Sequence, residues 1–524
     1  MMRRFIGDGI CCAVIIILCL GLGLPRYRFE IDLGDEGFLA YGAVRVMEGQ
    51  VPNRDFVSLQ PPLSFYTLAA MFKLFGTSLV SLRAMGLCIY VLIPVVLYAI
   101  LRQVGGRILS LAAALPATVL GIDFFNFVPY AVWQGELAAI LAVFFLIRAA
   151  VTGRRRWSIL AGAANVATLL LRHDQGVYLI VAAIAYIFAL RFASRDAVSK
   201  PDTGRMLRFW AGTMAVIMLP LVIYWFASGA AGYMFKQLVV FLLTRYTKTS
   251  SLPLPMFVAG RPFMNNLLIG LFYVPAVIEF LAAIWLLRLV VRRHFYIEHS
   301  HIAFILVLSM FFYLQALTRS DIYHSLITLP PFFILCAWFI GALSKAVGDA
   351  VGKSYDSQLA AVFSRRVVFV AAGLIAGGFL LYVKPAFLTW PAEATRDVLL
   401  DRGGVRLSLQ RAGSLEDIIK MVQREAEPNR SILCLPYQPM FYFLSGRHNP
   451  TRWNYLWPGD QTPEEHQALI NQAKSDPPAI VVIVYESDMQ NYAPAIIDYV
   501  HSEYKVAYDF GGLTVYSPLC REKP

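Results

Sequence analysis

Residues 32–56 read DLGDEGFLAYGAVRVMEGQVPNRDF, and they closely follow an apolar run at residues 6–24. Three acids, Asp32, Asp35 and Glu36, stand within five residues, just before a segment with helical periodicity. The apolar run is long enough to cross a bilayer. The three acids should therefore lie at a membrane surface, where a helix begins.

The composition of the whole chain indicates a polytopic membrane protein. The chain has 524 residues, of which 58% are hydrophobic and 15% are charged, and its mean hydropathy is +0.58. One soluble core cannot bury this much apolar surface. The net charge is +12, but the basic residues lie mostly in short gaps between apolar runs. This distribution marks cytoplasmic loops and makes the bilayer, not nucleic acid, the expected partner.

Apolar windows of about 17 to 25 residues predict about eleven membrane spans. They fall near 6–24, 79–101, 108–124, 133–150, 157–171, 176–193, 207–228, 266–290, 301–317, 322–344 and 367–383. The gaps that face inward in this scheme are all basic, so we expect a multi-pass protein of the inner (plasma) membrane with a cytoplasmic N-terminus. An odd number of spans then places the first loop, residues 25–78, and the C-terminal tail on the outer face. In this loop EGFLAYGAVRVMEG and PPLSFYTLAAMFKLFG predict two helices along the membrane surface. The alternative for the second helix is a short span, which would change the count.

The sequence of the tail predicts a small α/β domain. This domain should lie outside the membrane, in the periplasm or another extracytoplasmic space. SLEDIIKMVQREAEP, which begins at Ser414, is typical of a serine-capped helix. SILCLP and AIVVIVYES are typical of buried strands, and YKVAYDFGGLTVYS indicates a hairpin. We therefore expect a mainly α membrane domain at residues 1–388, with its outer first loop, and an α/β domain at residues 389–524. Cys434 and Cys520 could form a disulfide if that side is oxidising.

Two further groups of ionisable residues lie where predicted spans leave the membrane on the outer side. LRHDQG contains Arg172, His173 and Asp174, and TRSDIYHS contains Arg319, Asp321 and His324. Charges at membrane depth are costly and commonly mark a site or a pathway. The structural alternative for these two groups is that they are interfacial charges or internal ion pairs. The structural alternative for Asp35 and Glu36 is that the acids only complement the positive N-terminus of a helix. All three groups fall on one side of the membrane, which favours a site.

The first loop resembles that of the GT-C membrane glycosyltransferases, closest to the superfamily of protein O-mannosyltransferases and aminoarabinose transferases. The resemblance rests on DEG, the following amphipathic helix, EGQVPNRDF and QPPLSFYTLAAMFKLFGTSLVSLRAMG, across residues 35–86. The later spans match mainly in hydropathy. The tail stretch YFLSGRHNPTRWNYLWPG, residues 442–459, is similar to a stretch in uncharacterised bacterial relatives.

The resemblance implies an inverting transferase that takes a sugar from a polyprenyl-phosphate carrier at the outer face and joins it to an acceptor on a glycan, lipid or protein. It makes Asp35 the general base, with Glu36 supporting it. Our own inference assigns the donor phosphate to Arg172, His173, Arg319 and His324, because cations stabilise a leaving phosphate.

No cofactor follows from the sequence, although a divalent cation is left open. Asp123, Asp174 and Asp321 are candidate contacts to the acceptor or to a metal, and Glu136 lies in the same outward gap as Asp123. The alternatives are a multi-spanning transporter, an O-antigen polymerase or ligase, and a non-catalytic envelope scaffold whose tail binds polymer. Paired similar halves would favour the transporter, and none is visible in the sequence.

Overall fold

The structure is a computed structural model that describes residues 2–120, 127–193, 201–258, 260, 263–325, 328–354, 357–388, 394–510 and 512–519. The chain forms two compact units, and neither is one continuous stretch. The first unit comprises Met1–Arg26, Leu87–Val222 and Ser251–Trp390, and the second comprises Tyr27–Gly86, Ile223–Ser250 and Pro391–Pro524. The first loop and the tail therefore belong to the same unit.

Long apolar helices dominate the chain, as the hydropathy predicted. Within the described ranges nine helices are long and apolar enough to cross a membrane. They are α1 (Met2–Gly23), α4 (Leu79–Val104), α7 (Ala131–Thr152), α9 (His173–Phe192), α10 (Thr203–Ala227), α13 (Phe263–Val291), α14 (Ile297–Thr318), α16 (Leu329–Ser354) and α17 (Ser357–Leu388). The mainly α fold class and the multi-span membrane protein are confirmed.

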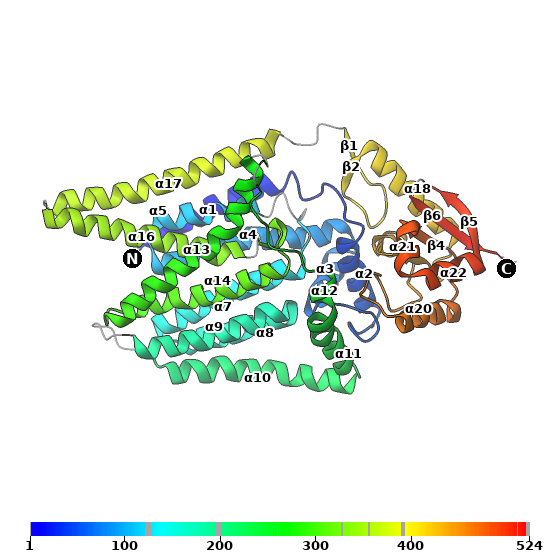
Figure 1. Cartoon of the computed structure of the whole chain (residues 1–524), viewed down its shortest axis with the longest axis horizontal. Coiled ribbons are helices and arrows are strands. Elements are labelled where there is room, and N and C mark those ends of the chain that lie inside the picture. Colours follow the sequence, from blue (N-terminus) through cyan, green and yellow to red (C-terminus); the bar gives the residue numbers. More distant parts are fainter. Residues whose placement is uncertain are drawn as a thin grey trace. The chain divides into compact units, whose positions relative to one another are not determined.

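The predicted span at 157–171 is α8 (Arg155–Leu171), which has 17 residues and is shorter than the nine candidate spans. It packs against both α7 and α9 (Figure 1). The connections on either side of α8 are very short, so the chain must return along α8 between its two longer neighbours. A Cβ on Gly176 would lie 2.6 Å from Leu169 Cα, a close approach that small residues permit between membrane helices.

The predicted span at 108–124 corresponds to two short helices, α5 (Arg107–Ala114) and α6 (Ala117–Leu120), and then leaves the described residues at position 121. Arg107 Nε donates to Asp8 Oδ1 over 3.0 Å, near the beginning of α1. At the other end of α1, a Cβ on Gly23 would lie 3.2 Å from Phe127 Cε1. Arg107 and Phe127 therefore lie near opposite ends of α1.

The first loop contains the two predicted helices, α2 (Asp35–Met47) and α3 (Leu63–Phe75). They pack against each other through the rings of Phe38 and Phe65, whose centroids are 5.6 Å apart, and a Cβ on Gly42 would lie 2.5 Å from Phe65. Helix α3 has 13 residues and is about 20 Å long at 1.5 Å per residue, which is too short to cross a bilayer.

A helical segment from Ala231 to Thr249 lies in the second unit with α2 and α3. It consists of α11 (Ala231–Phe235), two π-helical turns (Lys236–Val240 and Leu242–Tyr246) and α12 (Thr247–Thr249). The buried Gln237 Oε1 accepts from Ser58 N at 2.9 Å and from Asn53 Nδ2 at 3.1 Å. This side chain therefore fixes the irregular chain between α2 and α3.

The tail is an α/β region, as predicted. Its four-stranded sheet has the order β3-β4-β6-β5, in which β3 and β4 are parallel and the other pairs are antiparallel. The strands are β3 (Leu433–Leu435), β4 (Val481–Val484), β5 (Tyr504–Asp509) and β6 (Leu513–Pro518), and a separate pair is formed by β1 (Thr395–Asp397) and β2 (Arg406–Ser408). The helices are α18 (Leu409–Glu425), α19 (Met440–Ser445), α20 (Pro463–Ser475), α21 (Glu486–Tyr492) and α22 (Pro494–Glu503).

The first helix of the tail begins earlier than the sequence pattern suggested. Ser408, not Ser414, is the N-cap of α18, and its hydroxyl accepts from Arg411 N. The prediction placed the cap too late because Leu409 and Ala412 already belong to the helical pattern. Cys434 is buried, whereas Cys520 lies outside the described residues, as does the predicted boundary at residue 389, so a disulfide between the two cysteines stays a prediction.

Candidate active site

Asp35 is exposed and stands in the first turn of α2. The preceding turn is held by Asp32, whose Oδ1 accepts from Gly34 N at 2.9 Å and from Asp35 N at 3.2 Å. These bonds satisfy N–H groups that a helix start leaves without intrahelical partners. Asp32 thus orients the turn, and the Asp35 carboxylate projects from it.

Glu36, the next residue, is fully buried and paired with Arg83. Arg83 Nε donates to Glu36 Oε1 at 2.6 Å and Arg83 Nη2 donates to Glu36 Oε2 at 2.7 Å, with both side chains completely buried. Arg83 Nη1 also donates to Phe29 O at 2.6 Å. Such a bidentate pair joins the start of α2 to the start of α4. Glu36 therefore acts within the fold, beneath Asp35.

The second predicted group lies where α8 gives way to α9. Arg172 Nε donates to Asp174 Oδ1 at 2.9 Å and to Oδ2 at 3.2 Å. Asp174 Oδ2 also accepts from Gln315 Nε2 of α14 at 2.6 Å. His173 is the first residue of α9 and is half-buried.

The third group follows α14, at the short helix α15 (Ile322–Ser325). Asp321 accepts from His324 N at 2.9 Å, and its Oδ2 lies 2.8 Å from His324 Nδ1. Arg319 Nε is 3.6 Å from the same carboxylate. Asp321 and His324 therefore contact each other directly.

These two groups meet at one end of the first unit. Gln315, which bonds Asp174, is only four residues before Arg319 in the last turn of α14. The beginning of α7 lies at the same place, because a Cβ on Gly135 would be 2.8 Å from Arg172 Cβ and 2.5 Å from Gln175 Oε1. The structure therefore brings Arg172, Asp174 and Arg319 to one region, although they are far apart in sequence.

The predicted site residues are distributed over both units. Asp35 and Glu36 belong to the second unit, and the arginine, histidine and aspartate groups belong to the first. Asp123 lies outside the described residues. Glu136, for which the sequence offered no motif either, is fully buried in α7, and neither of its carboxylate oxygens has a hydrogen-bond partner among the residues that the structure describes.

Comparisons with known proteins agree with this architecture. Residues 59–225 match the family described as dolichyl-phosphate-mannose-protein mannosyltransferase. The match covers about a third of the chain, including Arg172 to Asp174, and begins after Asp35. No curated protein sequence matches the chain significantly.

The solved structure of ArnT from Cupriavidus metallidurans bound to undecaprenyl phosphate matches with a TM-score of 0.54 and 14% identity, covering 98% of both chains. The apo state of the same protein matches with a TM-score of 0.53 and 13% identity, covering 97% of both chains. The likeness in structure extends over the whole chain and gives the fold, and the family match gives the enzyme class. The chain is a GT-C-type glycosyltransferase.

The sequence did not single out two residues at the acidic turn of this glycosyltransferase. Arg83 lies within the predicted span at 79–101, and a lone arginine at such a position could have been noticed as costly without a partner. Tyr437, whose hydroxyl donates to Asp35 Oδ1 at 2.5 Å, is 402 residues away, and nothing local in the sequence indicates this contact.

The transferase contains no group of three or more His, Cys, Asp or Glu residues suited to a metal ion among the residues that the structure describes. Asp123 is not among them, so the cation left open by the sequence is still a prediction. Asp174 and Asp321 each have a basic partner in the structure.

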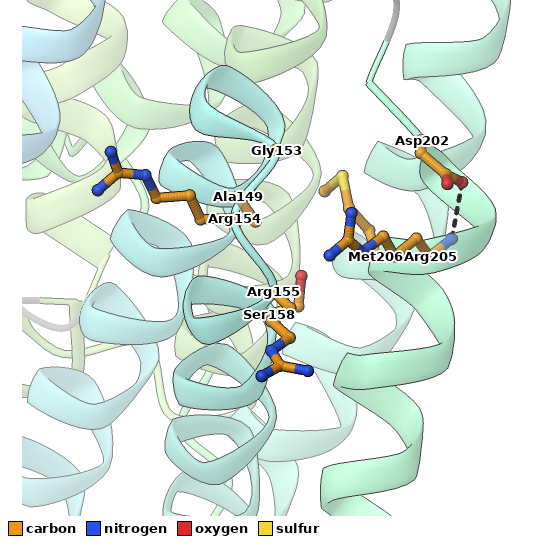
Figure 2. Close-up of a pocket in the computed structure, with 8 residues that line it drawn as sticks. All are labelled: Ala149, Gly153, Arg154, Arg155, Ser158, Asp202, Arg205 and Met206. Carbon is orange, nitrogen blue, oxygen red and sulfur yellow. Dashed lines mark hydrogen bonds between the residues drawn. The ribbon is translucent and has the colours of Figure 1, made fainter.

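A pocket of the glycosyltransferase lies at the other end of α8 from Arg172. Its lining residues are Ala149, Gly153, Arg154, Arg155, Ser158, Asp202, Arg205 and Met206. Arg154 and Arg155 point away from each other, as Figure 2 shows, so their side chains do not converge on one anion. Helix α8 separates this pocket from Arg172 by about 25 Å, given 1.5 Å per residue. The pocket is therefore distinct from the candidate active site.

Proposed function

We propose that this glycosyltransferase moves a sugar from a polyprenyl-phosphate carrier to a hydroxyl-bearing acceptor at the outer face of the membrane, with inversion at the anomeric carbon. The observation that carries the proposal is the contrast between two adjacent acids. Glu36 is buried and fully paired with Arg83, whereas Asp35 is exposed at the start of α2. In this proposal Asp35 is the general base and Glu36 holds it in place through the backbone.

The chemistry requires such a base. An acceptor hydroxyl must lose its proton as its oxygen bonds to the anomeric carbon, and a positioned carboxylate can take that proton. A general base of this kind typically contributes about 10²- to 10⁴-fold in rate. Inversion follows if the hydroxyl attacks from the side opposite the leaving phosphate in one step.

The leaving phosphate needs cations rather than an acid. Arg172 and Arg319 lie at one end of the first unit, and each is already within reach of an aspartate. A guanidinium group that keeps one carboxylate partner is oriented by it and still has other N–H donors for phosphate oxygens. We assign the donor phosphate to Arg172 and Arg319, with His173 and His324 beside them. The ArnT structure bound to undecaprenyl phosphate supports a carrier of this class.

The proposal also includes an orientation of the protein in the membrane. The basic connections, such as the one containing Arg154 and Arg155, belong on the cytoplasmic side of the inner membrane. The opposite helix ends, where Arg172 and Arg319 lie, then face outward. The first loop and the tail are proposed to be extracytoplasmic, with a glycan, lipid or protein as acceptor.

The test compares the polyprenyl-phosphate lipids and surface glycans of cells that express the wild type, Asp35→Asn or Asp417→Asn at equal levels. Asp417 is an exposed acid of α18 and serves as the charge-matched control. We expect a sugar-loaded carrier to accumulate, and one sugar to be missing from a glycan, only in Asp35→Asn. Normal lipids and glycans in Asp35→Asn cells would refute the role of Asp35.

A second measurement tests whether Arg172 and Arg319 bind the donor phosphate. With the purified protein and the carrier lipid identified above, Arg172→Ala and Arg319→Ala should each raise the donor KM, because each removes a charge-assisted hydrogen bond. Arg155→Ala is the control, since it lies at the far end of α8. Unchanged donor KM in both variants would remove the assignment. Dialysis against EDTA in the same assay decides whether a divalent cation is needed.

A further inference from the structure

A segment of the tail packs directly on the acidic turn. Met440 N donates to Leu33 O over 3.1 Å. A Cβ on Gly37 would lie 2.3 Å from Met440 N, and a Cβ on Gly34 would lie 2.8 Å from the ring of Tyr437. No side chain fits at either glycine without a shift of its neighbour. The turn that carries Asp35 and the tail segment around Tyr437 are therefore parts of one packed structure within the second unit.

Tyr437 connects Asp35 to a group of aromatic side chains. Its hydroxyl donates to Asp35 Oδ1, and its ring centroid is 5.8 Å from that of Trp457 and 6.0 Å from that of Tyr455. Tyr455 is buried and packs edge-on against Phe38 of α2 at 6.2 Å. The aromatic group thus rests on the same helix that begins with Asp35.

The backbone around Trp457 is fixed on both sides. Leu456 N donates to Pro436 O at 2.8 Å, and Trp457 N donates to Gln461 Oε1 at 3.0 Å. Despite this, the Trp457 side chain is 51% exposed. Trp457 therefore presents an accessible apolar ring from a backbone that hydrogen bonds hold in place.

Sugar rings fit this arrangement. The C–H groups on one face of a sugar ring carry slight positive charge and pack on the electron-rich face of an aromatic ring, while its hydroxyl groups bond to carboxylates and hydroxyls. Trp457 provides the apolar face, and Tyr437 and Asp35 provide polar atoms one ring away.

We infer that Trp457 and Tyr437 form a subsite for a sugar ring of the acceptor, so that the acceptor is a saccharide or a sugar-bearing lipid. The inference rests on the proposed function, in which Asp35 takes the proton of the acceptor hydroxyl and the donor phosphate binds in the other unit. Tyr437 acts as a positioning residue for the Asp35 carboxylate, and Trp457 binds the ring.

The test uses the purified full chain in lipid nanodiscs and a panel of methyl hexopyranosides as probes, with saturation-transfer-difference NMR as the measurement. The variants are Trp457→Ala, Trp457→Phe and Tyr437→Phe. Tyr485→Ala is the control, because Tyr485 is another tail aromatic and is 64% exposed. We expect at least one glycoside to bind the wild type and the control through its ring C–H groups, about five-fold more weakly to Trp457→Ala and at an intermediate level to Trp457→Phe.

The Tyr437→Phe variant separates the positioning role of Tyr437 from the sugar-binding role of Trp457. It keeps the ring, so glycoside binding should be retained, while kcat for transfer should fall without a change in donor KM. Absence of glycoside binding by the wild type, or equal binding by Trp457→Ala, would overturn the inference. If the lipid and glycan comparison shows no effect of Asp35→Asn while Trp457→Ala still loses the glycoside, the sugar subsite stands and the proposed function fails.

Discussion

Asp35 and Glu36 are neighbours in sequence, yet their surroundings differ completely. Glu36 is buried against Arg83, and Asp35 is exposed and bonded to Tyr437. Two adjacent residues at a helix start project in directions about 100° apart, since an α-helix has 3.6 residues per turn. One acid is therefore paired inside the fold while the other is accessible from solvent.

The buried pair should be important for stability. Removing one partner leaves an uncompensated buried charge, which typically costs about 3–5 kcal/mol. We expect Arg83→Leu and Glu36→Leu each to lower the thermal midpoint of the purified protein strongly. The double variant should be less unstable than the sum of the two single variants, because it leaves no unpaired charge. Strict additivity in this cycle would contradict a functioning ion pair.

The stability of the folded protein should depend on pH through Asp55. Its carboxylate accepts from the Arg54 side chain at 2.7 and 2.8 Å and from Val51 N at 2.7 Å, and the Arg54 hydrogen bonds hold the pKa of Asp55 below its ordinary value. The folded state thus favours the ionised form. The stabilisation is fully present above the ordinary pKa of about 3.8 and is lost as pH falls through the lower, folded value.

Asp55→Asn should therefore lower the thermal midpoint at pH 6, and the difference from the wild type should shrink as the pH approaches 3. Asp417→Asn provides the comparison, since Asp417 is exposed on α18. A midpoint difference for Asp55→Asn that stays constant between pH 6 and pH 3 would exclude this linkage.

At the scale of elements, helix α2 is the common support of the first loop and the tail. It packs on α3 through Phe38 and on the tail through stacked rings of Tyr41 and Tyr442, 4.8 Å apart. Arg45 is buried and donates to Asn454 Oδ1 at 3.1 Å and to Thr451 O at 3.4 Å. The tail stretch at 442–459, whose resemblance carried no role, therefore includes the surface that contacts α2.

A substitution at Gly37 tests the packing of the tail on α2. Alanine there would place a Cβ 2.3 Å from the Met440 backbone, so the tail segment or α2 must move, and overpacking typically costs about 1–3 kcal/mol. We expect Gly37→Ala to lower both the thermal midpoint and the rate of transfer. Gly212→Ala in α10 is the matched control, because no atom of the described residues lies within 4 Å of a Cβ there and alanine favours the helix. Equal behaviour of the two variants would show that the close approach at Gly37 is unimportant.

At the scale of the whole molecule, the proposed orientation, with a cytoplasmic N-terminus and an extracytoplasmic tail, requires an odd number of membrane passages. The predicted count of eleven adds α8 and the predicted span at 108–124 to the nine long helices that the described residues contain. With a cytoplasmic N-terminus, the tail faces outward only if α8 and the predicted span at 108–124 both cross the membrane or neither of them does.

Cysteine labelling checks this topology. In a background without native cysteines, a membrane-impermeant maleimide applied to intact spheroplasts should label Ser414→Cys in the tail and leave Arg155→Cys, at the first residue of α8, unlabelled. Both positions are exposed, so both should react after permeabilisation. Labelling of Arg155→Cys in intact spheroplasts would reverse the orientation and move the proposed site to the cytoplasmic face.

The sequence by itself determined the membrane class, the helices of the first loop and the strands of the tail, because hydropathy and periodicity are local properties of the chain. It also placed Asp35 at a helix start. Only the tertiary structure decided which acid is buried and which is exposed, because the partners Arg83 and Tyr437 are 47 and 402 residues distant. Contacts over such separations depend on how the elements pack, and no local pattern encodes them.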